Sequence, residues 1–287
     1  MNSQGNRKRR WAILLLAAVL LVFMLRWFVN SQVYHPSRSR DANGSELNRP
    51  FEDVFFDTTD GVKLNGWFFP ADTNATHRAL AVLVCHGNAG NITHRLGLCR
   101  ALLATGVNVF LLDYRGYGRS AGRPSEEGTY RDAQAAYRWL RAKGFAATNI
   151  VAYGESLGGA VAAELAMREP LGGLVLQSTF TSIPDIGAEL FPWLPARWIA
   201  TIRYDTHSKL PLIRIPVLVM HSRTDDLIGF RHSERNFAAA NQPKWFYELA
   251  GEHNDPPGEQ ERFRAGMEEL LRHVGGAGPE APASGIR

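Results

Sequence analysis

The sequence predicts an α/β fold with a mostly parallel, doubly wound sheet, and three observations support this prediction. From residue 80 onward, apolar runs of strand length alternate with helical patterns, and runs that are apolar on both faces are typical of parallel strands covered by helices. Before them, Thr59-Asp60-Gly61 separates two apolar runs, which favours an antiparallel hairpin. Between residues 178 and 215 no strand pattern is found, and so long an insertion predicts a small helical lid.

The elements of this fold can be placed in chain order from their patterns. The helix expected before residue 144 has apolar residues at Ala133, Tyr137 and Leu140, with Thr129 as its N-cap and Gly144 as its end. We find no internal repeat. We expect strands at residues 54–56, 62–69, 80–84, 107–112, 150–153, 174–176, 217–220 and 245–249.

The N-terminal segment has the composition of a membrane anchor. Residues 7–10 are all basic, and an uncharged run from Trp11 to Leu25 follows them. Arg26 interrupts the run, and three further apolar residues bring it near the length of about 20 residues that a membrane span needs. A cleaved signal peptide is the alternative, but Ser31 lies at a poor cleavage site. We therefore expect residues 1–30 to form a basic flank and one uncleaved transmembrane helix.

The charge around this helix predicts its orientation. The positive-inside rule keeps the basic N-terminus in the cytoplasm and exports the rest of the chain, which means the periplasm in a Gram-negative cell. After the helix we expect a polar linker at residues 31–50 and one α/β domain at residues 51–274. Residues 275–287 are rich in glycine, proline and alanine, and this composition predicts a disordered tail.

Composition excludes several classes of function. Five of the 32 Lys and Arg residues lie in residues 1–31, and the other 27 are matched by 28 Asp and Glu, so no surface for nucleic acid is predicted. Cys85 and Cys99 are the two cysteines, and their spacing fits neither a metal site nor a disulfide framework. We expect no metal and no cofactor. The sequence carries no signal for an oligomeric state.

A candidate nucleophile lies in the motif Gly154-Glu155-Ser156-Leu157-Gly158. The motif follows an apolar strand pattern and precedes a helix of small residues, and this context is the one that a G-x-S-x-G nucleophile turn requires. Such a turn holds its serine in strained backbone with the hydroxyl clear of the sheet, while glycines avoid collisions. We expect Ser156 to be the nucleophile, against the alternative of a glycine-rich turn with no chemistry.

A serine hydroxyl needs a base, and the base needs an acid that orients it. On this type of turn, the partners follow the serine in the order acid, then histidine, each after a strand. His253 directly follows the last strand pattern and is the expected base; the other histidines considered are His207, His221, His232, which we expect to be exposed, and His273. Asp225 follows the strand pattern at 217–220 and is the expected acid, with Asp226 and then Asp205 as alternatives.

The remaining part of such a site is a pair of N–H groups that stabilise an oxyanion. One is expected on Leu157, directly after the serine and at a helix N-terminus. The other is expected on the loop after residue 85, from Asn88 or, as the alternative, from Ala89. His86 precedes the serine in the chain, so we expect it to be a structural, hydrogen-bonded residue.

With these residues in place, the chain from about residue 50 to 274 resembles the α/β-hydrolase superfamily, and within it the membrane-anchored, serine-aminopeptidase-type hydrolases. The resemblance implies the α/β-hydrolase fold and supports the same triad and oxyanion residues. Ser222 and Glu252 stand where similar sequences usually have glycine, and neither removes a catalytic group. The resemblance is carried by the segments HGNAGN at 86–91, DYRGYGRS at 113–120, GESLG at 154–158, HSRTD at 221–225 and GEH at 251–253.

We expect the protein to be a serine hydrolase that cleaves esters or thioesters through an acyl-serine intermediate. The anchor and the aromatic lid favour a lipid or acyl substrate, with Phe180, Phe191, Trp193 and Trp198 as candidate substrate-contacting residues. A serine aminopeptidase is the first alternative; it needs an acid for the free amine of its substrate. The lid offers Asp185, Glu189 and Asp205 for that purpose. A non-enzymatic anchored scaffold is the second alternative.

Overall fold

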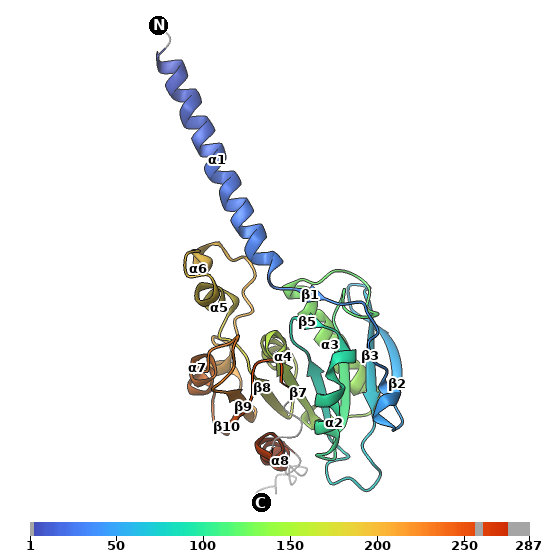
Figure 1. Cartoon of the computed structure of the whole chain (residues 1–287). Helices are drawn as coiled ribbons and strands as arrows, with labels where there is room; N and C mark the ends of the chain where they lie inside the picture. The colour runs from blue at the N-terminus through green and yellow to red at the C-terminus, as the bar shows by residue number, and fades with distance from the viewer. Residues whose placement is uncertain (1–2, 256–260, 275–287) are drawn as a thin grey trace, which may run out of the picture.

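An eight-stranded sheet forms the centre of the computed structural model, which describes residues 3–255 and 261–274 (Figure 1). The strand order is β10-β9-β8-β7-β4-β6-β3-β2. The strands from β10 to β6 are parallel, and β2 and β3 form an antiparallel hairpin at one edge, as predicted. The strands are β2 (Glu52–Asp57), β3 (Lys63–Phe69), β4 (Ala81–Cys85), β6 (Asn108–Asp113), β7 (Ile150–Glu155), β8 (Gly173–Gln177), β9 (Val217–Ser222) and β10 (Lys244–Leu249).

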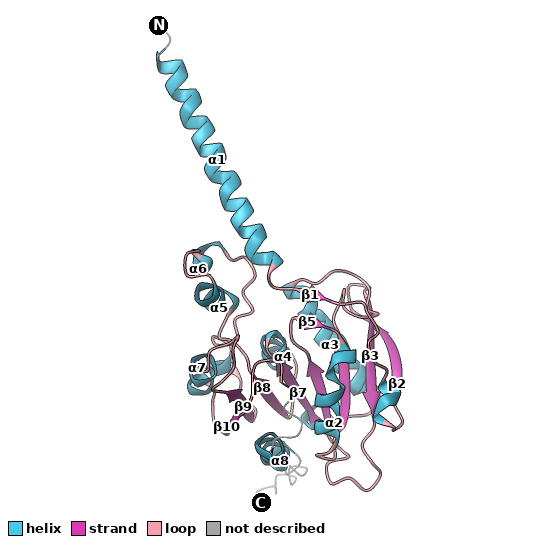
Figure 2. Ribbon diagram, viewed as in Figure 1, coloured by secondary structure: helices cyan, strands magenta, loops and turns pink. Residues whose placement is uncertain are grey.

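Helices cover both faces of this sheet (Figure 2). One hydrophobic cluster joins one face to α2 (Leu96–Leu103) and α8 (Glu261–Val274), and the other joins the opposite face to α3 (Glu126–Ala142) and α4 (Leu157–Arg168). Phe237 of α7 (Arg231–Ala239) packs on the same cluster as α3 and α4. Successive side chains of a strand point to opposite faces of the sheet. Because helices cover both faces, the side chains of β7 are buried on both sides. Short 3-10 turns lie at η1 (Gly44–Leu47), η2 (Ile92–Arg95), η3 (Ala147–Asn149) and η4 (Leu210–Leu212).

The start of α3 differs from the prediction. Ser125 is the N-cap, because its side chain accepts a hydrogen bond from the N–H of Gly128 while its own backbone stays extended. The predicted cap, Thr129, lies inside the first turn, where its hydroxyl donates to the carbonyl of Glu126 at 2.9 Å. The prediction of Thr129 was therefore wrong by one helical turn. The predicted end is confirmed: Gly144 follows the helix with φ +105°, a conformation that glycine adopts without strain.

The expected lid lies between β8 and β9 and is helical. It contains α5 (Ile183–Leu190) and the single turn α6 (Ala196–Ile199), followed by η4. The side chain of Ser182 caps α5 by accepting from the N–H of Asp185, and Pro184 fits the first turn, where no N–H donor is needed. Figure 1 places α5 and α6 beside the domain end of the N-terminal helix.

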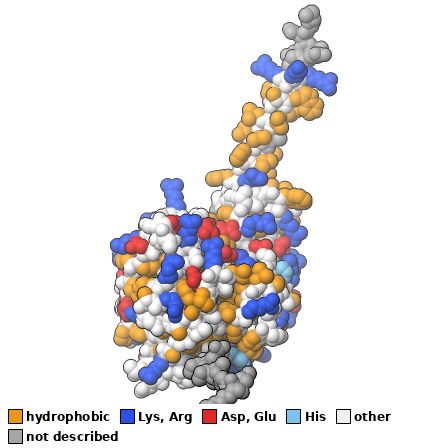
Figure 3. All heavy atoms as spheres, turned by 180° about the vertical axis from the view of Figure 1, so that it is seen from behind, with side chains coloured by type: hydrophobic (Ala, Val, Ile, Leu, Met, Phe, Trp, Pro, Cys, Tyr) orange, Lys and Arg blue, Asp and Glu red, His pale blue; other side chains and the backbone are white. Residues whose placement is uncertain are grey.

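That N-terminal helix, α1 (Ser3–Ser31), extends away from the α/β domain (Figure 1). Its stretch Arg7–Phe28 has 22 residues and a mean hydropathy of 2.3, so it is long and apolar enough to cross a membrane by length and composition. Hydrophobic side chains coat the helix, and basic side chains gather near its far end (Figure 3). Its domain end packs on the lid, with the ring of Phe28 5.6 Å from that of Phe191.

The segment after α1 is part of the domain rather than a free linker. The strand β1 (His35–Pro36) pairs in parallel with β5 (Ala89–Gly90), and the side chain of Val33 is buried in the main core. The hydrophobic pattern did not predict this, because the pairing uses backbone groups and needs no periodic apolar residues. The predicted tail at residues 275–287 lies outside the described residues.

Candidate active site

Ser156 lies at the sharp turn between β7 and α4. Its backbone has φ 53° and ψ −119°, a conformation that is strained for a residue with a side chain. The turn requires glycine on both sides, as predicted. A Cβ on Gly154 would lie 2.3 Å from the Cα of Gly159, and one on Gly158 would lie 1.9 Å from the carbonyl oxygen of Cys85. The close approach of α4 to β4 therefore places the serine at the carboxyl edge of the sheet.

His253 and Asp225 meet Ser156 at that edge, because β7, β9 and β10 are parallel and their carboxyl ends lie on the same side. The Nε2 of His253 is 3.1 Å from the Oγ of Ser156, and its Nδ1 is 2.8 Å from the Oδ2 of Asp225. The side chains are nearly excluded from solvent, with Ser156 5% and His253 8% exposed. The three residues that the sequence selected thus form one hydrogen-bonded chain.

The two alternative acids lie elsewhere. The carboxylate of Asp226 accepts the backbone N–H of His253 at 3.0 Å and so supports the histidine loop from the other side. Asp205 accepts the backbone N–H of Ser208 within the lid. Of the three carboxylates considered, only that of Asp225 is hydrogen-bonded to the imidazole of His253 in the described structure.

Asp225 is held by more groups than the sequence indicated. Its Oδ1 accepts the backbone N–H groups of Leu227 and Ile228, at 3.0 and 2.7 Å. Its Oδ2 also lies 3.0 Å from the Nε2 of the buried His221, which donates to the carbonyl of Ile228 as well. Burial alone would raise the pKa of Asp225, but the hydrogen bonds from His221, His253 and Ile228 outweigh it and lower that pKa below its usual range. The carboxylate therefore stays ionised at neutral pH.

Sequence reasoning considered His221 only as a possible base and missed this supporting role. The available signal was its position at the end of β9, four residues before the acid. His232 was predicted to be exposed, and that prediction was wrong. His232 is buried under the lid. Its Nδ1 accepts the N–H of Thr181 at 3.1 Å, and its Nε2 faces Glu189. His273 lies on the solvent side of α8, as expected.

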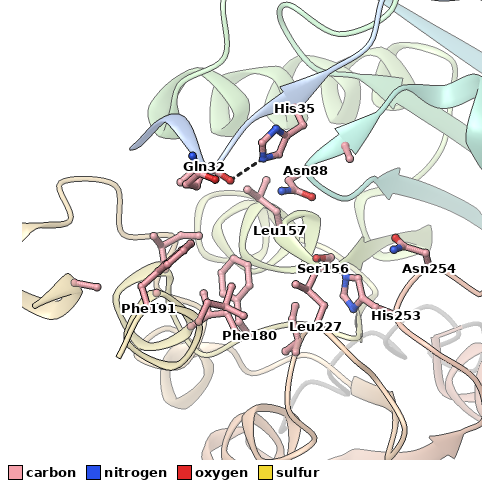
Figure 4. Close-up of a pocket in the computed structure, with 18 residues that line it drawn as sticks. Gln32, His35, Asn88, Ser156, Leu157, Phe180, Phe191, Leu227, His253 and Asn254 are labelled. Carbon is pink, nitrogen blue, oxygen red and sulfur yellow. Dashed lines mark hydrogen bonds between the residues drawn. The ribbon is translucent and has the colours of Figure 1, made fainter. Parts of the chain in front are cut away.

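The predicted oxyanion groups border the same cavity as the serine (Figure 4). Leu157 is the first residue of α4, where helix N–H groups are free of intrahelical acceptors. Asn88 lies in the bend after β4, and among the described residues no acceptor takes its N–H. Burial lowers the pKa of His86 to about 3, so this residue is neutral, and its Nδ1 donates to the carbonyl of Gly87 at 2.7 Å. His86 therefore has the structural role that was expected.

An apolar cavity of about 390 Å³ opens at Ser156. It extends beneath the lid, and Figure 4 shows Phe180 and Phe191 on that side of the serine. Its lining also includes Gln32, Val33 and His35 from the segment after α1, which no sequence signal indicated. The apolar lining residues from the lid and the Asp225 loop are Phe180, Ile183, Ile186, Leu190, Phe191, Ala196, Leu227 and Ile228.

Two of the four lid residues that were predicted to contact substrate do not line this cavity. Trp193 is 69% exposed and Trp198 is 87% exposed, and neither lines the cavity. In the single turn of α6, Ala196 and Ile199 are three residues apart and share the buried face, so Trp198 points the other way. Trp193 lies on the outer side of the lid, 6.5 Å from the ring of Phe28 at the end of α1.

Chemically, this arrangement can deprotonate a serine hydroxyl beside an apolar chamber. It needs no metal for that step, and the described residues contain no group of three or more His, Cys, Asp or Glu that could hold one. The strained serine, the imidazole between two oxygen atoms and the two N–H groups are the parts that acyl transfer to serine requires.

Comparisons with known proteins identify chains of similar sequence. A family model described as serine aminopeptidase, S33, matches residues 76–209. The Mycobacterium tuberculosis protein Rv2307c is 41% identical over 256 residues, which cover 87% of this chain and 90% of that protein. The alpha/beta hydrolase domain-containing protein WAV2 of Arabidopsis thaliana is 34% identical over 241 residues, covering 76% and 78%.

Solved structures show the same fold. An esterase of Pyrococcus furiosus, Pf2001, has a TM-score of 0.68 at 21% identity and covers 83% of this chain and 98% of its own. An alpha-beta hydrolase of Vibrio vulnificus also has a TM-score of 0.68, at 18% identity, and covers 88% and 93%. Because WAV2 is 34% identical to this chain over 78% of its own length, and the solved structures share the fold, the chain belongs to the α/β-hydrolase superfamily.

Proposed function

We propose that the protein is a membrane-anchored serine hydrolase that cleaves ester or thioester bonds of lipid or acyl substrates. The observation that carries this proposal is the hydrogen-bonded chain from Ser156 through His253 to Asp225 at the mouth of an apolar cavity. A nucleophile, a base and an orienting acid at these distances have the geometry of acyl transfer.

In the proposed reaction, the Nε2 of His253 takes the hydroxyl proton as Ser156 Oγ attacks the acyl carbon. The oxyanion that forms accepts hydrogen bonds from the N–H groups of Leu157 and Asn88. His253 then donates the proton to the leaving alcohol or thiol, and the acyl group stays on the serine. A water molecule, deprotonated by the same imidazole, attacks the acyl carbon, and the imidazole returns this proton to Ser156 Oγ as the carboxylic acid leaves. Throughout the cycle, the ionised Asp225 holds the imidazole by its Nδ1–H.

The cavity supports an acyl chain as the substrate group. Its lid side consists of aliphatic and aromatic residues, so each methylene that enters it gains about 0.8 kcal/mol of transfer free energy. The cavity is also bordered by Gln32 and Val33, directly after α1. If α1 spans a bilayer, the opening of the cavity lies close to the membrane surface, where acyl lipids are concentrated.

The exposed tryptophans of the lid also support a position of the cavity opening near the membrane surface. Trp193 and Trp198 lie at the domain end of α1, together with Trp27, which is 71% exposed. Tryptophan is enriched where a membrane meets water, because its ring is apolar and its N–H is polar. We propose that these rings lie in the interface, with the basic N-terminus of α1 in the cytoplasm and the domain exported, into the periplasm in a Gram-negative cell.

An aminopeptidase function is less well supported, despite the description of the matching family model. The three lid acids that could bind a free amine are all engaged elsewhere. Asp185 pairs with Arg197 at 3.2 Å, Glu189 pairs with Arg231 at 2.7 Å, and Asp205 accepts a backbone N–H. None of the three borders the cavity at Ser156.

A fluorophosphonate probe tests the proposed nucleophile. The full-length protein should be labelled and should hydrolyse p-nitrophenyl esters, whereas Ser156→Ala should do neither. Equal labelling of the variant would exclude the mechanism, and an inert wild type would favour a scaffold.

A series of esters and thioesters of rising chain length tests the substrate class. We expect kcat/KM to rise from acetate to at least octanoate, and a preference for acetate would contradict an acyl-chain cavity. Faster release of alanine or proline from dipeptide amides than of alcohols from esters would instead favour the aminopeptidase.

A further inference from the structure

The segment after α1, residues 32–37, is built into the domain through two of its side chains. The side chain of Val33 is buried in the main core, with 5% of its surface exposed. The hydroxyl of Tyr34 lies 3.1 Å from that of the fully buried Tyr204, and the two rings are in edge contact. The imidazole Nε2 of His35 donates to the carbonyl of Gln32 at 3.0 Å. The segment therefore has one defined path across the domain.

This path runs along the loop that follows β4, which carries Asn88. The pairs His35–Ala89 and Pro36–Gly90 form the parallel ladder between β1 and β5, which lie side by side in Figure 2. The N–H of His35 donates to the carbonyl of Asn88 at 3.0 Å, and the N–H of Ser37 donates to that of Gly90 at 3.0 Å. The segment thus fastens both ends of the turn that contains the second predicted oxyanion group.

The N–H groups of Asn88 and Ala89 are the two candidate oxyanion donors on this turn, and each belongs to a peptide whose carbonyl accepts a hydrogen bond. The carbonyl of Gly87, in the peptide that carries the Asn88 N–H, accepts from His86. The carbonyl of Asn88, in the peptide that carries the Ala89 N–H, accepts from His35 and from the hydroxyl of Tyr117 at 2.7 Å. In a planar trans peptide the N–H points opposite to the carbonyl, so fixing each carbonyl fixes the direction of each N–H.

The segment also borders the substrate cavity. Gln32, Val33 and His35 line it, and Figure 4 shows His35 between Gln32 and Asn88. Only three residues separate the last residue of α1, Ser31, from His35. A shift of the anchor relative to the domain would therefore be transmitted directly to the turn at Asn88.

We propose that residues 32–37 are a positioning element of the active site, which orients the oxyanion turn through the backbone N–H of His35 and links the membrane anchor to catalysis. This inference rests on the proposed serine hydrolase function. The segment makes no covalent contribution. It holds the carbonyl of Asn88, which orients the N–H of Ala89 directly and the N–H of Asn88 through the Cα of Asn88 that joins the two peptides. Its loss should resemble the weakening of an oxyanion donor, which costs about 10²- to 10³-fold in kcat when a donor is removed outright.

The test uses the full-length protein in detergent with p-nitrophenyl butyrate. His35→Pro removes the N–H that donates to Asn88, whereas the matched control Arg38→Pro introduces a proline just beyond the segment, at an N–H that donates no hydrogen bond among the described residues. We expect His35→Pro to lower kcat by at least about 30-fold with KM within about threefold of wild type, and the control to stay within about threefold in both. Inhibition by a trifluoromethyl ketone, whose adduct places an oxyanion in the site, should weaken in parallel with kcat.

Tyr117→Phe provides a second route, because it removes the other donor to the same carbonyl. We expect it to lower kcat by about tenfold without raising KM, and this result decides the question if His35→Pro does not fold. Unchanged kcat in a folded His35→Pro variant, or in Tyr117→Phe, would overturn the inference, and so would a loss confined to KM.

The two proposals fail in different ways. An inactive wild type, or a Ser156→Ala variant as active as wild type, would reject the serine hydrolase itself. Normal results for both of these proteins together with a fully active His35→Pro variant would reject only the positioning role.

Discussion

Replacing Asp225 with asparagine tests the identity of the acid most directly, because the structure determines which way the new amide must face. Oδ1 accepts two backbone N–H groups, at 3.0 and 2.7 Å. An NH₂ group at that position would meet two donors, so the amide oxygen must take this place. The NH₂ group then occupies the Oδ2 position, 2.8 Å from the Nδ1 of His253. The Nε2–H of His221, which is 3.0 Å from that position, keeps its hydrogen bond to the carbonyl of Ile228.

The consequence follows from the tautomer of the histidine. Facing an NH₂ group, the Nδ1 of His253 must become the acceptor, so the ring proton moves to Nε2. A protonated Nε2 cannot accept the hydroxyl proton of Ser156, from which it is 3.1 Å away. The same change in a serine protease triad lowers kcat by about 10⁴-fold, which corresponds to about 5.5 kcal/mol of transition-state stabilisation. We expect a loss of that size for Asp225→Asn.

Asp226→Asn is the matched control. Asp226 is the neighbouring acid. Among the described residues it accepts only the backbone N–H of His253, which an amide oxygen can also accept. Its kcat should stay within about tenfold of wild type, because the change exchanges a charged acceptor for a neutral one. Steady-state hydrolysis of p-nitrophenyl butyrate measures kcat, and near-ultraviolet circular dichroism checks that both variants are folded. An Asp225→Asn variant within tenfold of wild type, or an Asp226→Asn variant equally damaged, would refute this assignment.

Three further predictions follow from packing and burial. Gly187→Leu narrows the cavity at α5 and removes room for about two methylene groups, which are worth about 1.6 kcal/mol of transfer free energy. The ratio of kcat/KM for octanoate to kcat/KM for butyrate should therefore fall by about 15-fold. An unchanged ratio would contradict this prediction. Gly158→Ala places a methyl group against the backbone of β4 and should destabilise the fold by about 3 kcal/mol or more, so an unaltered melting temperature would contradict it. Burial raises the pKa of Asp113 to about 7, so the folded state retains a proton that the unfolded chain loses above about pH 4. Stability therefore falls as pH rises from about 4 to about 7, and this group contributes up to about 1.4 kcal/mol per pH unit. Asp113→Asn should reduce this dependence of stability on pH, as measured by thermal unfolding. An equal dependence in the variant and the wild type would count against the prediction.

The success of the sequence-based placement of Ser156, Asp225 and His253 has a simple physical basis. In a parallel sheet, residues that directly follow strands gather at one edge whatever the loops between them do. Apolar strand patterns, which local composition reveals, therefore predict which polar residues will meet. The glycines around Ser156 are also local signals, because backbone contact at Gly158 leaves no room for a side chain. Their catalytic roles remain to be tested by the variants above.

Two of the errors concern side chains whose burial cannot be read from local patterns. The aromatic composition of the lid was evident, but α6 has only one turn, too short for a periodic pattern to separate the buried Ile199 from the exposed Trp198. The burial of His232 likewise depends on the N–H of Thr181, 51 residues earlier in the chain.

The sequence by itself therefore determined the α/β fold, the apolar N-terminal helix and the residues that follow each strand, because all of these depend on short-range patterns of polarity and glycine. Only the tertiary structure decided which side chains line the cavity, that His221 supports Asp225, and that the segment after α1 lies beside Asn88. Those relations depend on backbone hydrogen bonds and packing between distant segments. Nearly any residue supplies an N–H such as that of His35, so no pattern of side chains could reveal its partner.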